Sequence, residues 1–158
     1  MQLNAKTDYA IRMVVYLAAH KGVVSAQDLS AAVGITTKQY VFSIVNDLRG
    51  VGLIASARGV NGGFYLAKAP EEITLWDITM ATESTMQIAH TAPDGADASG
   101  QLPEYQLVGK VYETLQYRLE SVLKFVSIAD ILRLSGKGAD LNSAAGHTAQ
   151  IRVKSEIA

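Results

Sequence analysis

The chain has 158 residues, of which 49% are hydrophobic, and this length predicts one compact domain or a small domain with an appendage. It contains no cysteine, which excludes disulfides, thiolate nucleophiles and cysteine-ligated metal sites. Since no leader pattern begins the chain and no run of about 18 apolar residues occurs in it, we expect a cytoplasmic protein.

The formal net charge of −1 hides a difference between the two halves of the chain. Residues 1–68 carry seven Lys and Arg against three acids, whereas residues 69–158 carry seven against twelve. Such an asymmetry favours a basic half that meets a polyanion, with a chance distribution as the open alternative.

Three short helices are predicted first. In residues 6–22, "KTDYAIRMVVYLAAHKG", one face is apolar and Gly22 follows as a stop. In "VSAQDLSAAVG", Ser25 and Asp28 form an acidic variant of the capping box before Leu29 and Val33, and Gly34 breaks the chain.

The third helix is predicted within "ITTKQYVFSIVNDLRGVG", where Thr36 and Gln39 form a second capping-box pattern. Its apolar residues recur at helical spacing, namely Val41, Ile44, Val45 and Leu48. The opposite face is polar and carries Lys38, Gln39, Ser43 and Asn46.

Two capped helices joined by a tight glycine turn are typical of a helix-turn-helix, whose second helix enters the major groove of DNA. The alternative is an ordinary helical hairpin with a solvated polar face. The next residues favour the first interpretation, because the strand-like segments "LIASA" and "GFYLAK" flank "RGVNG" as in a β-hairpin. A helix-turn-helix followed by a hairpin is the winged arrangement.

The hairpin turn carries Arg58 and the pair Gly62 and Gly63. Glycines would let the wing approach another molecule closely, and Arg58 could enter a narrow minor groove, where the negative potential is enhanced. Alternatively, Arg58 is a solvated turn charge, and the glycines serve the turn alone.

These segments resemble the Rrf2 family of bacterial winged-helix transcription regulators. The resemblance rests on "MQLNAKTDYAIRMVVYLA", "VSAQDLSAAVGIT", "GLIASARGVNGGFYLAKAPEEITLWDI" and "SIADIL", and covers roughly residues 1–132. It implies a homodimer that binds a partly palindromic promoter site, usually as a repressor. The chain departs from the family pattern at Val60 and Asn61, which interrupt the glycine-rich wing, and in "TTKQYVF", which only partly matches the start of the recognition helix.

We therefore predict a mainly α fold with a small β-hairpin wing, comprising a winged helix-turn-helix domain at 1–68, an effector-loop and dimerisation region at 69–134, and a tail at 135–158. The residues predicted to read the major groove are Thr37, Lys38, Gln39 and Ser43. Those predicted on the wing are Arg58, Asn61 and Gly62. Those predicted near phosphates, at or near helix N-termini, are Lys6, Tyr9, Ser25 and Gln27.

After the wing, Thr74 and Asp77 form a further capping pair at the start of a short helix. Residues 84–104 contain two prolines and two glycines and are predicted to form a long loop. Residues 105–127 are predicted to form a long helix that pairs with its symmetry mate through a stripe comprising Leu107, Val111, Leu115, Leu119, Val122 and Val126. Packing of this stripe against the winged domain is the alternative.

Many Rrf2 members carry three cysteines in this loop, and these hold an iron–sulfur cluster. A cluster needs thiolate ligands, so His90, Asp94, Asp97 and Glu104 cannot replace a full cysteine set. We expect no cofactor here: either the protein senses another signal, such as a small molecule, or its cysteines have been replaced.

The tail after residue 134 is rich in small and polar residues, and we expect it to be loosely structured, although "AQIRVKSEI" alternates enough for a strand. The chain shows no phosphate-binding glycine loop, nucleophile elbow or zinc-protease motif, which argues against an enzyme. A winged-helix module that binds proteins rather than DNA is the remaining alternative.

Overall fold

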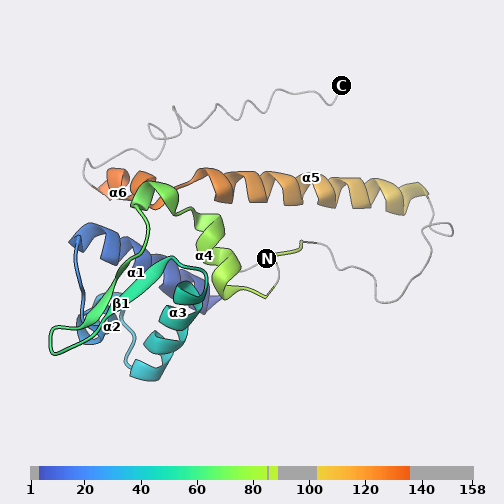
Figure 1. Cartoon of the computed structure of the whole chain (residues 1–158). Helices are drawn as coiled ribbons and strands as arrows, with labels where there is room; N and C mark the ends of the chain where they lie inside the picture. The colour runs from blue at the N-terminus through green and yellow to red at the C-terminus, as the bar shows by residue number, and fades with distance from the viewer. Residues whose placement is uncertain (1–3, 85, 89–102, 136–158) are drawn as a thin grey trace.

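The computed structural model describes residues 4–84, 86–88 and 103–135. In chain order, the elements are α1 (Ala5–His20), α2 (Ala26–Val33), α3 (Lys38–Gly50), β1 (Ile54–Ala57), β2 (Gly63–Leu66), the 3-10 helix η1 (Pro70–Glu72), α4 (Leu75–Thr82), α5 (Pro103–Phe125) and α6 (Ile128–Ser135). Helices α1 to α4 and the hairpin form a compact body, and α5 extends from it as a long arm (Figure 1). The predicted fold class, mainly α with a hairpin wing, is confirmed.

The core forms where the apolar faces of the first three helices meet. The predicted buried face of α3 is confirmed, since Val41, Ile44, Val45 and Leu48 are all buried. Residues from the second half of the chain, Ile73, Ile78 and Ile128, belong to the same buried cluster. The winged body therefore also buries residues from the second half of the chain, both just after the wing and at the start of α6.

The ends of α1 and α2 follow local capping rules. Ser25 caps α2 by accepting a bond from the Asp28 amide, and Gly34 ends that helix in the left-handed conformation, as predicted. At the end of α1 the left-handed residue is Lys21 (φ 44°), directly before the predicted stop Gly22.

The hairpin is two-stranded and antiparallel, and Ile54 pairs with Leu66 and Ala57 with Gly63. A third segment joins it, because Val24 and Phe64 exchange both backbone hydrogen bonds, of 2.9 and 2.8 Å. This pairing ties the wing to the connection between α1 and α2.

A second backbone pairing joins the arm to the body. Leu75 donates its amide to the Val126 carbonyl at 3.0 Å, and Ile128 donates to the Ile73 carbonyl at 2.9 Å. Thr74 with Asp77 and Ser127 with Asp130 then cap α4 and α6, so both helices start from this pairing.

The long helix begins and ends two residues earlier than the predicted 105–127. Pro103 suits a first helical turn, where its missing N–H costs nothing, and Val126 already pairs with Leu75. Residues 103–104 thus belong to α5 and not to the predicted loop. Residues 89–102 and 136–158, including His90, Asp94, Asp97 and the strand expected in the tail, lie outside the described residues.

Candidate nucleic-acid interface

The outward face of α3 carries the polar side chains predicted to read DNA. Lys38, Gln39 and Ser43 are exposed, and so is Asn46 one turn further on. Amide, hydroxyl and ammonium groups are the types that bond to base edges in the major groove.

The N-terminus of α3 differs from those of α1 and α2. The Asn4 side chain accepts from the Lys6 amide at 2.7 Å, and Ser25 caps α2, whereas no described side chain caps α3. The predicted capping box of Thr36 with Gln39 is wrong, because Thr37 is the N-cap residue and its carbonyl accepts the first helical bonds. The first turn of α3 thus lacks the side-chain acceptor that the other two helices possess.

The wing presents Arg58 at the start of its turn, exposed to solvent. The Gly62 amide donates to the Gly59 carbonyl at 3.0 Å, which makes Val60 and Asn61 the corner residues of a four-residue turn. Both corner side chains are exposed, and Val60 fully so. The tip therefore displays one cation, one amide and one apolar side chain.

The glycine pair is required by the protein's own backbone. A Cβ on Gly62 would lie 2.6 Å from the Ala57 carbonyl oxygen, and one on Gly63 would lie 2.1 Å from that of Val24. The glycines thus permit the turn and the pairing with residue 24. These two constraints explain both glycines without the close approach of another molecule.

An aromatic contact places the wing beside α3. Phe42 on α3 and Phe64 on β2 meet edge to face, with ring centroids 5.9 Å apart. Phe42 remains 45% exposed on the helix that carries the predicted reading residues. Sequence reasoning did not single out Phe42, and the one indication that it lies near the predicted reading face is its position next to Ser43.

The four residues predicted near phosphates have different surroundings. Lys6 forms an ion pair with Asp47 of α3, and the Tyr9 ring meets Tyr40 of α3 edge to face at 5.9 Å. The Ser25 hydroxyl already donates to the Asp28 carboxylate and accepts from the Asp28 amide, and Gln27 is exposed. Asp47 and Tyr40 were not singled out by sequence reasoning, because only the folded chain brings them to α1.

Most of the predicted stripe on α5 is exposed. Leu107 is 63%, Val111 56%, and Leu115 and Val122 each 47% exposed, while Leu119 and Val126 are half-buried. At 3.6 residues per turn, the six side chains span an arc of about 120°. The alternative of packing against the chain's own winged body is therefore not seen for most of the stripe within the described residues.

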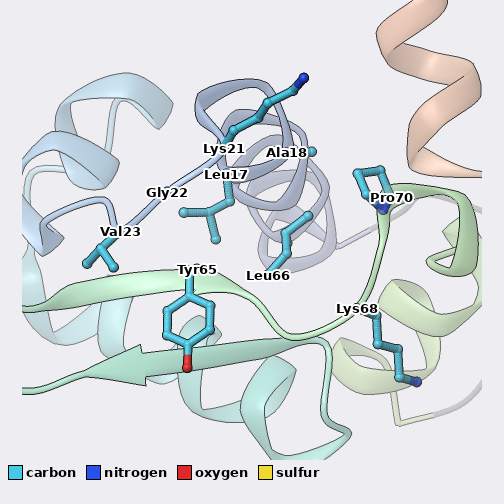
Figure 2. Close-up of a pocket in the computed structure, with 9 residues that line it drawn as sticks. All are labelled: Leu17, Ala18, Lys21, Gly22, Val23, Tyr65, Leu66, Lys68 and Pro70. Carbon is cyan, nitrogen blue, oxygen red and sulfur yellow. The ribbon is translucent and has the colours of Figure 1, made fainter.

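A shallow hollow of about 540 Å³ lies between the end of α1, the following connection and β2 (Figure 2). Its lining is mainly apolar, with Leu17, Val23 and Leu66 among the residues. Lys21 and Lys68 lie at its edge and extend in different directions in Figure 2. They do not converge on a common point, so the described residues assemble no polar site in this hollow.

The helix pair α2 and α3, followed by a hairpin packed against α3, defines a winged helix-turn-helix protein. Residues 3–134 match the sequence model of the Rrf2 family, described as an iron-dependent transcriptional regulator. The chain belongs to the Rrf2 family of transcriptional regulators and is not an enzyme. The predicted family is confirmed.

Among curated relatives, the chain is similar to the HTH-type transcriptional regulator NsrR of Halalkalibacterium halodurans, with 31% identity over 84% of this chain and 90% of that protein. It is 33% identical to the regulator Rv1287 of Mycobacterium tuberculosis, over 83% and 81% of the two chains.

Solved structures share the fold. IscR of T. potens matches with a TM-score of 0.69 and 24% identity, over 89% of this chain and 92% of that one. CymR, the global cysteine regulator of B. subtilis, matches with a TM-score of 0.69 and 22% identity, over 83% of this chain and 95% of that one.

The iron named in the family description can be tested against this chain's donors. The sequence contains no cysteine, and the described residues contain no group of three or more His, Asp or Glu that could hold a metal ion. The donor set therefore does not fit an iron–sulfur cluster. Within residues 4–84, 86–88 and 103–135, no helix has the length and apolar character needed to cross a bilayer.

Proposed function

We propose that the protein is a cluster-free transcriptional repressor that binds a partly palindromic operator as a homodimer and acts in the cytoplasm. The observation that carries DNA binding is the first turn of α3. It lacks a side-chain cap among the described residues, and it carries an exposed Lys38 and Gln39 beside the hairpin. Free amides and a cation at a helix N-terminus suit the negative potential of a DNA groove.

In this proposal, α3 lies in the major groove and the wing in the adjacent minor groove. Thr37, Lys38, Gln39 and Ser43 meet base edges, and the exposed Arg58 and Asn61 meet the minor groove. Gly62 contributes by permitting the turn that holds these two side chains. The excess of basic residues in 1–68 supplies the attraction to phosphates.

Phosphate contacts are proposed for the helix ends around the reading head, which comprises α2, α3 and the wing. Ser25 and Gln27 lie at the start of α2, and Lys6 and Tyr9 lie in the first turns of α1. Because Asp47 neutralises Lys6, a phosphate there would share the ammonium group with that carboxylate. We therefore expect Lys6 to contribute less than a lysine such as Lys38 on the exposed face of α3.

The exposed α5 stripe supports the dimer. Its arc of about 120° is wider than a narrow coiled-coil seam. A second copy of the chain, related by a two-fold axis, would bury Val111 and the neighbouring stripe residues of both arms, which are exposed in the single chain. Two reading heads related by such an axis would require inverted half-sites, hence the palindrome.

The proposal is tested by selecting binding sites from a random duplex library and titrating the selected duplex at several salt concentrations. A DNA-binding dimer yields an inverted repeat, and its log affinity falls linearly with log salt, because phosphate contacts release counterions. If no duplex is enriched and no salt dependence is found, the protein-interaction alternative replaces DNA binding. Reduced transcription from a promoter carrying the selected site tests repression.

A further inference from the structure

The carboxylate of Glu83, the residue after the last turn of α4, reaches back to the first helix of the chain. Its Oε1 accepts from the Asn4 amide at 3.0 Å and from the Thr7 hydroxyl. The Thr7 oxygen also lies 2.9 Å from the hydroxyl oxygen of Thr82. Glu83 thus holds the first turn of α1.

This network satisfies a polar group that water does not reach. Thr7 is 0% exposed, and the side chains of Thr82 and Glu83 are the hydrogen-bond partners of its hydroxyl. Removal of the Glu83 carboxylate would leave the buried Thr7 hydroxyl with Thr82 as its one described side-chain partner and would release the exposed Asn4 amide to water, which favours a shift of the first turn of α1 toward solvent.

The turn that Glu83 holds and the turn after it also touch α3. Lys6 pairs with Asp47, and the Tyr9 ring packs edge to face against Tyr40. These two contacts lie on neighbouring turns of α1 and span the middle of α3. The orientation of the α3 reading face therefore depends on where the start of α1 sits.

We infer that Glu83 is a positioning residue for operator binding: by fixing the first turn of α1, it fixes α3 in the orientation that reads the operator. The inference rests on the proposed DNA-binding function.

The test compares Glu83→Ala, Glu83→Gln and Glu72→Ala. Glu72 is a matched control, because its carboxylate also accepts a backbone bond, from Ala69 at 3.1 Å, and its removal changes the net charge equally. The glutamine side-chain oxygen can accept both hydrogen bonds that Glu83 accepts, so Glu83→Gln should retain operator binding. Each variant is titrated against the selected operator and a scrambled duplex, and its melting temperature is recorded.

We expect Glu83→Ala to weaken operator binding about tenfold relative to Glu72→Ala, as the loss of two hydrogen bonds predicts, and to leave scrambled-duplex binding within about twofold. Glu83→Gln should bind the operator within about twofold of the parent. Equal loss on both duplexes, or tighter operator binding by Glu83→Ala, would overturn the positioning role.

A variant at the other end of the network tests the inference even if Glu83→Ala folds poorly. Thr7→Val keeps the buried shape but removes the hydroxyl, and it should reproduce the selective loss. The double variant should lose little more than either single one, because both act through one network. Additive losses contradict the inference. Failure of the parent protein to select any duplex contradicts the proposed function instead.

Discussion

The Lys124 ammonium lies 4.4 Å from the centroid of the Trp76 ring, in cation–π contact. Lys124 lies in the last turn of α5, and Trp76 lies in the first turn of α4. Together with the backbone bond from Leu75 to Val126, this contact fixes the base of the arm on the winged body. In a dimer joined through the arms, the two reading heads would therefore keep a fixed spacing.

The dimer is tested at the middle of the stripe. Leu115→Glu or Leu119→Glu should dissociate it, because a charge would be buried unpaired between two arms. Light scattering measures the mass. Tyr117→Glu is the control, since Tyr117 is 74% exposed and lies on the opposite side of α5. An unchanged dimer in both stripe variants would remove the stripe from the interface.

The wing is tested with Arg58→Ala, which should weaken operator binding by about 1–3 kcal/mol and leave stability nearly unchanged, because the side chain is exposed on a turn. The loss should be largest where A·T pairs narrow the groove under the wing. Titration against the operator and a version with G·C pairs at that place measures this. Equal losses on the two duplexes would exclude recognition of a narrow minor groove by Arg58 and would leave it only a nonspecific attraction to phosphates.

Lys38→Ala provides the comparison for Arg58. If Lys38 only neutralises backbone charge, its loss should weaken all duplexes alike and reduce the salt slope by about one unit. A loss confined to one operator position would instead assign Lys38 to a base edge.

The absence of thiolate ligands predicts that the protein, prepared anaerobically with iron and sulfide, stays colourless. Visible absorbance accompanied by stoichiometric bound iron is the result that contradicts this.

The α6 cap makes stability depend on pH. The side-chain bond from Ser127, its backbone bond and the nearby Arg133 lower the pKa of the Asp130 carboxyl. A carboxyl whose pKa is lowered by folding stabilises the fold above its unfolded pKa of about 4 and loses that contribution as the pH falls. Asp130→Asn should therefore be destabilised at pH 7, and its difference from the parent should shrink as the pH falls below about 4. Denaturant unfolding at a series of pH values from 7 downward measures this, with exposed Glu113→Gln as the control.

Two glycines give opposite expectations for stability. Gly63→Ala would place a Cβ 2.1 Å from the Val24 oxygen and should destabilise the wing, whereas Gly109→Ala in α5 meets nothing within 4 Å and should stabilise by up to about 1 kcal/mol. Thermal unfolding of the two variants checks the contrast. Stabilisation by Gly63→Ala would contradict the observed pairing of residues 24 and 64.

The features predicted correctly from the sequence are those with a local signature. The Ser25 cap, the Gly34 stop and the buried face of α3 each arise from residues within one or two turns. The Thr36 cap was wrong even though its sequence pattern is present, because α3 starts one residue later. A spacing rule does not determine which of two adjacent threonines ends the extended segment.

Contacts between distant segments could not be predicted in this way. Glu83 with Thr7, Lys6 with Asp47 and Val24 with Phe64 leave no periodic trace in the sequence, because each pairing depends on how the elements pack. For the glycine pair, the sequence left two roles open, the turn itself or close approach to another molecule, and the carbonyl oxygens that surround the pair account for the first.

The attachment of the chain to the winged body at Glu83 and again at Val126 has an evolutionary consequence. The chain leaves the winged body at Glu83, tied to Asn4, and returns at Val126, tied to Leu75. A segment anchored at both ends can gain or lose residues at a modest cost in closure entropy, without disturbing the core that it leaves. New input signals and new distances between half-sites could thus arise by changes between these two anchors, while the reading head is inherited intact.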